Sequence, residues 1–187
     1  LTVHTGDVLE DDVTAALDGW LAAGRPDQRF RVVGNLPYNI SSPILYLLTR
    51  WWRHWPGLVD ATVMLQADVA DRLVARPSTG EYGVLTLVTS LSAEVTRVLE
   101  LPPGAFRPQP KVRSTLVRLR FRAPSPPVPH AGLVDRLVRV AFTQRRKTLA
   151  NTLKALAGAD GLEIGAVLPG ARRVSERSAR KTTCAAM

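Results

Sequence analysis

The stretch that decides the fold reads Val32-Val33-Gly34-Asn35-Leu36-Pro37-Tyr38-Asn39-Ile40-Ser41-Ser42-Pro43-Ile44. Phe30-Arg31-Val32-Val33 is rich in aromatic and β-branched residues, which indicates a short strand that ends at Gly34-Asn35. Ser41 or Ser42 can cap a helix that has Pro43 in its first turn and runs to about Trp52. The loop between them therefore follows a strand directly, which is where open α/β sheets bind ligands.

The rest of the first 122 residues alternates between strand and helix patterns. Helices are predicted at 12–22 and 67–75, and strands at 1–4, 61–65, 95–101 and 112–121, while residues 82–91 fit either. In the last strand one alternating set is the more apolar and predicts a buried face: Arg113, Thr115, Val117, Leu119 and Phe121. Strands that alternate with helices indicate a layered α/β domain.

The proline-rich segment at residues 123–130 can continue neither a strand nor a helix, so it reads as a linker. We therefore predict three parts: an α/β domain at 1–122, the linker at 123–130, and a small, basic, helical domain at 131–187. Helices are predicted in that domain at 133–142 and 148–156. The tail beyond about residue 170 has the composition of a disordered segment.

Composition narrows the class of protein. Hydrophobic residues make up 45% of the 187 residues and charged residues 22%, which is typical of a soluble globular protein. The longest apolar runs, such as residues 84–88, are far too short to span a membrane. The formal net charge of +9 favours a polyanionic partner, because each neutralised phosphate releases condensed counterions.

Cysteine and histidine usage limits the possible metal and redox chemistry. Cys184 is the single cysteine, so the chain can form neither an internal disulfide nor a cysteine-based zinc site. The three histidines are scattered and predict no metal site. A reducing, cytoplasmic location is expected.

The loop Asn35-Leu36-Pro37-Tyr38 carries groups suited to chemistry on an exocyclic amine. Asn35 offers an amide oxygen, and backbone carbonyls beside Pro37 add a second acceptor on a stiff loop. Two acceptors would hold the amine hydrogens and direct its lone pair at a methyl donor, which is catalysis by positioning and needs no metal. Tyr38 could stack on a base. Taken alone, the four residues also fit an ordinary strand-to-helix turn.

The longer string 32–44 strongly resembles the fourth methyltransferase motif of the ribosomal RNA adenine dimethyltransferases. Four further stretches resemble the same family in the same order: Met64–Leu73, Tyr82–Leu85, Pro103–Ser114 and Ala141–Leu149. The resemblance covers about residues 1–157. It implies a partial Rossmann-like, S-adenosylmethionine-dependent methyltransferase domain followed by a small all-helical domain. The implied reaction is dimethylation of adenine N6 in small-subunit (16S) ribosomal RNA during ribosome biogenesis.

The resemblance also assigns roles to individual residues. It places the target amine at Asn35, Leu36 and Pro37, and the base between Tyr38 and a second aromatic side chain, Phe106. For Phe106 without its motif, core packing would be the simpler interpretation. Cofactor contacts are implied for Asp7, which follows Gly6, and for Asn35. Two basic clusters are expected to contact RNA phosphates: Lys111 and Arg113, with Arg118, Arg120 and Arg122 further along, and Arg145, Arg146 and Lys147.

One part of the family pattern has no counterpart among these 187 residues. The glycine-rich loop after the first strand, and the acidic residue after the second, are missing. We therefore expect the chain to be a fragment that binds S-adenosylmethionine poorly and is inactive as given.

Two alternative functions stay open. One is an erythromycin-resistance methyltransferase acting on large-subunit RNA, although those enzymes usually carry an Asn-Ile-Pro-Tyr style of loop. The other is a non-catalytic RNA-binding protein for ribosome assembly. The leading expectation is a monomeric enzyme that acts on a preassembled small ribosomal subunit, away from membranes.

Overall fold

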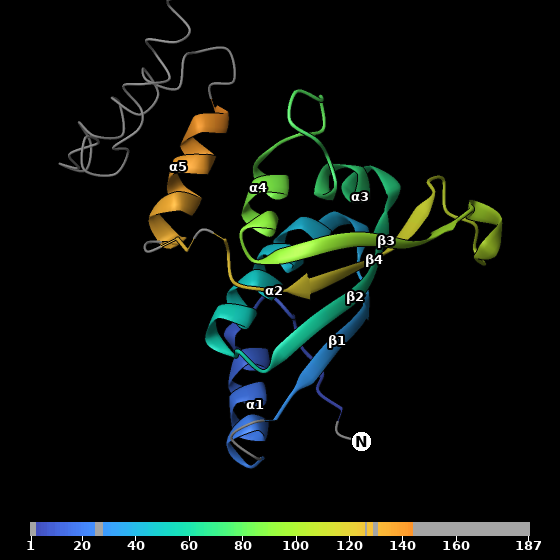
Figure 1. Cartoon of the computed structure of the whole chain (residues 1–187). Coiled ribbons are helices and arrows are strands. Elements are labelled where there is room, and N and C mark those ends of the chain that lie inside the picture. Colours follow the sequence, from blue (N-terminus) through green and yellow to red (C-terminus); the bar gives the residue numbers. More distant parts are fainter. Residues whose placement is uncertain (1–2, 25–27, 126, 129–130, 144–187) are drawn as a thin grey trace, which may run out of the picture. The chain divides into compact units, whose positions relative to one another are not determined.

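The computed structural model describes residues 3–24, 28–125, 127–128 and 131–143 (Figure 1). Contacts within the chain divide it into two compact units, Leu1–Ala131 and Gly132–Met187. In the second unit, the described part is helix α5, which begins at the boundary and spans Ala131–Thr143.

The first unit holds the α/β fold that the sequence predicts. Its elements follow in the order α1 (Asp11–Ala22), β1 (Phe30–Asn35), η1 (Tyr38–Ile40), α2 (Ser41–His54), β2 (Leu58–Gln66), α3 (Ala67–Leu73), α4 (Val84–Ser90), β3 (Ala93–Leu101), η2 (Pro103–Ala105) and β4 (Ser114–Phe121). The strands form one sheet in the order β1-β2-β4-β3 (Figure 1). β1 and β2 are parallel, whereas β4 lies antiparallel between β2 and β3.

The core lies between one face of this sheet and the helices that cover it. Alternate residues of β2 and β4 are buried on that face, as the period of two in a strand requires: Ala61, Val63, Leu65, Val117, Leu119 and Phe121. The apolar side of α2 packs on them through Leu45 and Leu48, which are 0% and 1% exposed. Figure 1 shows α2, α3 and α4 on the same side of the sheet.

Trp51 of α2, and Trp55 directly after the end of α2, hold α1 beside the sheet. The indole N–H of Trp55 donates to Asp18 at 2.7 Å, and that of Trp51 donates to Thr14 at 3.4 Å. The ring of Trp55 also meets Phe30 edge to face, with centroids 6.3 Å apart. These contacts fix the start of β1, and therefore the direction in which β1 delivers the loop that follows it.

Two expectations about the first elements are wrong. Val3 and His4 form no strand, and Val3 is 78% exposed. A strand needs a hydrogen-bonded neighbour, and no described strand pairs with these residues. Neither Ser41 nor Ser42 caps α2, because Ile40 occupies that position. The turn η1 runs directly into the helix, so Ser41 is its first residue and donates instead to the carbonyl of Tyr38 at 3.2 Å.

The structure also defines the boundaries of helices and strands that the sequence pattern did not fix. The ambiguous segment 82–91 contains a helix, α4 (Val84–Ser90), whose Leu85 and Val88 are buried. In the last strand Thr115, Val117, Leu119 and Phe121 are buried as predicted. Arg113, predicted with them, is exposed, because it precedes β4, which begins at Ser114. Helix α3 ends at Leu73, and α5 includes the predicted helix at 133–142. The predicted helix at 148–156 and the tail lie outside the described residues.

Replacing Leu45 by alanine should lower the free energy of unfolding by about 3 kcal/mol, because it empties a fully buried site between α2 and the sheet. Urea unfolding followed by tryptophan fluorescence measures this loss. The matched control is Leu99→Ala in β3, where the side chain is 52% exposed and the expected change is within about 0.5 kcal/mol. Equal losses from the two variants would contradict the core described above.

Candidate active site

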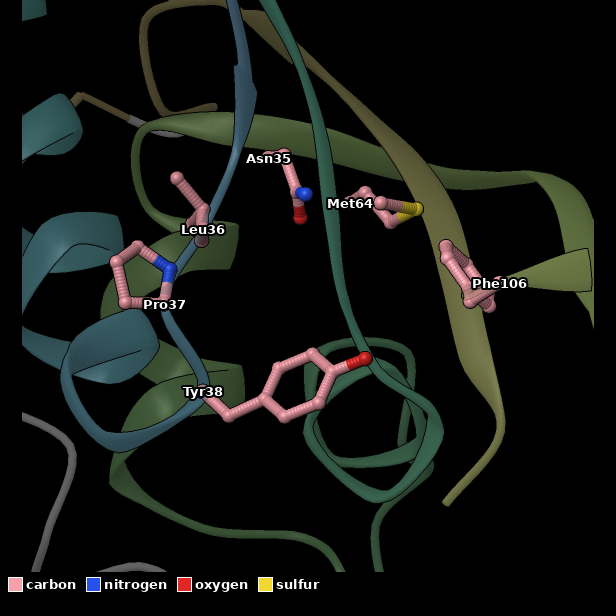
Figure 2. A pocket seen from close by; sticks show the side chains of 6 residues that line it. All are labelled: Asn35, Leu36, Pro37, Tyr38, Met64 and Phe106. Atoms are coloured by element: carbon pink, nitrogen blue, oxygen red, sulfur yellow. The ribbon is translucent and has the colours of Figure 1, made fainter. Parts of the chain in front are cut away.

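An open pocket of about 320 Å³ lies at the carboxyl ends of β1 and β2. It is lined by Asn35, Leu36, Pro37, Tyr38, Met64 and Phe106 (Figure 2). The structure thus brings together the five residues for which the sequence predicts catalytic roles. The loop 35–38 and Phe106 lie far apart in the sequence. They become neighbours because of the order of the strands in the sheet.

The backbone of the loop is fixed on both sides. The N–H of Leu36 donates to the carbonyl of Met64 at 3.0 Å, which extends the β1–β2 ladder by one residue. The side chain of Leu36 is 8% exposed and belongs to the core, so only its backbone is available to a ligand. The carbonyl of Pro37 already accepts the N–H of Ile40 at 3.2 Å. The carbonyl of Leu36 is therefore the better candidate for the second acceptor.

Asn35 is the last residue of β1 and is exposed. It shares a side of the strand with Val33, which is 81% exposed, and faces Met64 across the parallel ladder. Figure 2 shows its amide group pointing into the space between the other lining residues. Among the described residues none forms a hydrogen bond with this amide, so its oxygen and nitrogen are both available to a ligand.

Two aromatic side chains border the same space from different elements. Tyr38 is half-buried at the start of η1, and its hydroxyl shares a 2.8 Å hydrogen bond with that of Ser114 at the start of β4. Phe106 is half-buried just after η2, where its N–H donates to the carbonyl of Pro103 at 3.2 Å. Phe106 is absent from the hydrophobic core of the unit. Its ring instead forms part of the pocket lining (Figure 2).

Met64 also lines the pocket, although the resemblance assigns it no role. It lies in β2, in register with both Asn35 of β1 and Leu116 of β4, and is half-buried. The alternation of side chains along β2 indicates that Met64 is accessible. Thr62, Met64 and Gln66 share the face opposite to the buried Val63 and Leu65. What the sequence lacked was the pairing that sets Met64 beside Asn35.

Asp7 lies elsewhere, in the loop before α1, and does not line this pocket. Its carboxylate accepts the N–H of Leu9 at 2.9 Å, and its carbonyl accepts the N–H of Glu10 at 3.1 Å. These bonds are those of a turn that leads into a helix. The side chain is exposed, so its second carboxylate oxygen can still meet a ligand. The cofactor role of Asp7 stays a prediction.

The predicted RNA-binding residues fall into three groups. Lys111 and Arg113 are exposed in the loop between Phe106 and β4, where the Arg113 guanidinium lies 3.8 Å from the Glu100 carboxylate, and Arg120 and Arg122 are exposed as well. Arg118, by contrast, is engaged in a 3.2 Å hydrogen bond to Asp60, which is 3% exposed. That pairing neutralises the charge of Arg118. Arg145, Arg146 and Lys147 lie outside the described residues.

Within the described ranges, no group of three or more histidine, cysteine, aspartate or glutamate side chains gathers in a way that could hold a metal ion. No helix in the same part of the chain has both the length and the apolar character needed to cross a membrane.

Two solved structures have a similar fold. A dimethyladenosine transferase from Plasmodium falciparum aligns with a TM-score of 0.60 at 29% identity, over 81% of this chain and 49% of its own. The 23S rRNA methyltransferase ErmE aligns with a TM-score of 0.51 at 27% identity, over 79% of this chain and 62% of its own.

Curated relatives are more similar in sequence. Ribosomal RNA small subunit methyltransferase A of Pseudomonas aeruginosa is 40% identical over 172 residues, and that of Vibrio cholerae is 41% identical over 176 residues. These matches cover 91% and 92% of this chain but 60% of each relative, so the chain spans about three fifths of their length. The model of the family described as ribosomal RNA adenine dimethylase matches residues 1–176. The chain therefore belongs to the ribosomal RNA adenine dimethylase family.

Proposed function

We propose that this chain carries the target-base site of an enzyme that dimethylates adenine N6 in small-subunit ribosomal RNA, with S-adenosylmethionine as methyl donor. The observation that carries the proposal is the pocket at the end of β1, where an available amide group and two aromatic side chains border one space. A base that enters this space must leave its helix or come from a loop of the RNA.

The reaction needs the amine held so that its lone pair points at the methyl donor. With the base between Tyr38 and Phe106, the amide oxygen of Asn35 and the carbonyl of Leu36 would each accept one N–H of the adenine amine. A positive charge develops on N6 as it attacks, and both oxygens would stabilise it. The proton lost after the transfer then passes to solvent through the open side of the pocket.

When bound, S-adenosylmethionine supplies an electrophilic methyl group on a sulfonium. Two residues of this chain fit its contacts. The amide of Asn35 is available at the pocket, and the exposed carboxylate of Asp7 has an oxygen left to accept a hydrogen bond from an adenine amine. This chemistry requires no metal ion.

The second methyl transfer places a stricter demand on the pocket. The monomethyl amine has one N–H left, so only one of the two acceptors can hold it, and the wall must admit the first methyl group. Met64 borders that space, and a flexible thioether side chain adapts to such a change in shape more easily than a branched one.

The partner in this proposal is the preassembled small ribosomal subunit, which a monomeric enzyme would meet in the cytoplasm. Lys111 and Arg113 are exposed close to Phe106 in sequence and would contact RNA phosphates beside the flipped base. Arg145, Arg146 and Lys147 would add further phosphate contacts. Such contacts fix the position of the enzyme without reading sequence.

The test is a methyl-transfer assay on small ribosomal subunits that lack the modification, with large subunits assayed in parallel. The protein is used both as its gene encodes it and as the 187-residue chain. The RNA is digested and analysed for dimethyladenosine by mass spectrometry. Product in small-subunit RNA supports the proposal. Product only in large-subunit RNA favours the resistance-enzyme alternative, and RNA binding without product favours an assembly factor.

A further inference from the structure

We propose that Ser114 is a positioning residue for the target base, which it controls through Tyr38. The two hydroxyl groups share a 2.8 Å hydrogen bond in which either can donate. Ser114 lies at the first position of β4 and does not line the pocket, so its influence passes through the aromatic ring. The inference rests on the proposed function and extends it to a residue behind the site.

Ser114 is a rigid anchor. It is 0% exposed, and its backbone pairs with Gln66 of β2 on one side and Leu101 of β3 on the other. The preceding carbonyl, of Arg113, accepts the N–H of Ala67 at 3.0 Å. A serine held by two neighbouring strands cannot follow a moving partner, so its hydroxyl marks a fixed point at the end of the sheet.

Tyr38 would be mobile without that anchor. It begins a three-residue 3₁₀ turn, and its carbonyl accepts a 3.2 Å hydrogen bond from the hydroxyl of Ser41. The ring is half-buried on the border of an open pocket. The bond to Ser114 ties the far end of the ring, so the ring is held at both ends and cannot swing into or out of the space it shares with Phe106.

A ring held in advance lowers the cost of ordering the base, and misplacement of a reacting group by about 1 Å can slow a reaction about 100-fold. The second transfer should be the more sensitive step. The monomethyl amine has lost one N–H, so the orientation of the base depends more strongly on its stacking against Tyr38. Loss of the anchor should therefore lower the ratio of dimethyladenosine to N6-methyladenosine.

The hydrogen bond itself is tested by a double-mutant cycle in urea unfolding, which needs no activity. Ser114→Ala and Tyr38→Phe should each raise the unfolding equilibrium constant about fivefold, and the double variant should raise it no further than the larger single change. The matched control is Ser92→Ala, since Ser92 is also buried, at 1% exposed. Its effect on the unfolding equilibrium constant should multiply with that of Tyr38→Phe. Multiplying effects for Ser114→Ala and Tyr38→Phe would overturn the proposal.

The positioning role is tested on unmodified small ribosomal subunits. Ser114→Ala and Tyr38→Phe should lower the ratio of dimethyl to monomethyl product by the same factor, about three- to tenfold, with the KM for subunits unchanged. A ratio equal to that of the unsubstituted protein would overturn the proposal even if the stability coupling is present.

A third measurement separates this inference from the proposed function. In protein labelled with 3-fluorotyrosine, the ¹⁹F signal of position 38, assigned by its loss in Tyr38→Phe, should move in Ser114→Ala toward the shift of an exposed tyrosine. An unchanged signal would overturn the positioning role. A shift in the protein as its gene encodes it, with no methyl transfer by that same protein, would refute the proposed reaction and leave the anchor standing.

Discussion

Replacing Asn35 by alanine should lower kcat for methyl transfer about 100- to 1,000-fold, the loss typical of removing one preorganised group that stabilises developing charge. The amide oxygen is proposed to hold one N–H of the target amine, and no other described side chain lining the pocket offers an equivalent acceptor: Leu36, Pro37, Met64 and Phe106 have none, and the hydroxyl of Tyr38 is engaged with Ser114. Single-turnover kinetics on unmodified small subunits measure the loss directly.

The matched control is Asn39→Ala. Asn39 has the same side chain, lies in η1 directly after the loop, and is exposed without lining the pocket. Its replacement should change kcat by less than about twofold, as expected for a surface position. Because Asn35 is exposed at the end of a strand, neither change should alter the urea midpoint or the affinity for subunits. A loss of activity that accompanies a loss of folding in Asn35→Ala would contradict a catalytic role.

Replacing Phe106 by alanine should weaken transfer about 10- to 100-fold, mainly through KM, because base–aromatic stacking contributes about 1–3 kcal/mol per base. The structure favours stacking over a packing role, since Phe106 is half-buried, borders the pocket and is absent from the core. The affinity for RNA phosphates should persist, so that the variant still binds subunits in a salt-dependent way.

A series at position 106 separates stacking from simple apolar contact. Phe106→Trp and Phe106→Tyr keep an aromatic face and should retain activity within about threefold, whereas Phe106→Leu keeps apolar volume without such a face and should resemble alanine. Comparable KM values for the leucine and tryptophan variants would show that the pocket needs bulk at this position and not a stacking surface.

The local sequence was sufficient to predict the strand–loop–helix around Asn35. The signals are local: β-branched residues at 32–33, the proline at 37 and the apolar spacing of 44–51. Each favours a backbone conformation within a few residues of its own position, so no distant contact is needed to interpret it. The buried alternation of β4 was predictable for the same reason. Where the sequence pattern gave a wrong or ambiguous prediction, contacts with distant parts of the chain decided the secondary structure. Val3 and His4 have strand propensity but no described strand beside them, and residues 82–91 became a helix because Leu85 and Val88 pack on the core.

By itself, the sequence determined the class of fold, the loop that presents Asn35 and Tyr38, and the family to which the chain belongs. Only the tertiary structure decided which side chains meet that loop. The parallel pairing of β1 with β2 sets Met64 beside Asn35, and the antiparallel insertion of β4 next to β2 brings Ser114 against the hydroxyl of Tyr38. Propensity and periodicity act over a few residues along the chain. The order of strands in a sheet is decided by which distant segments together bury the most apolar surface, and no local pattern records that choice.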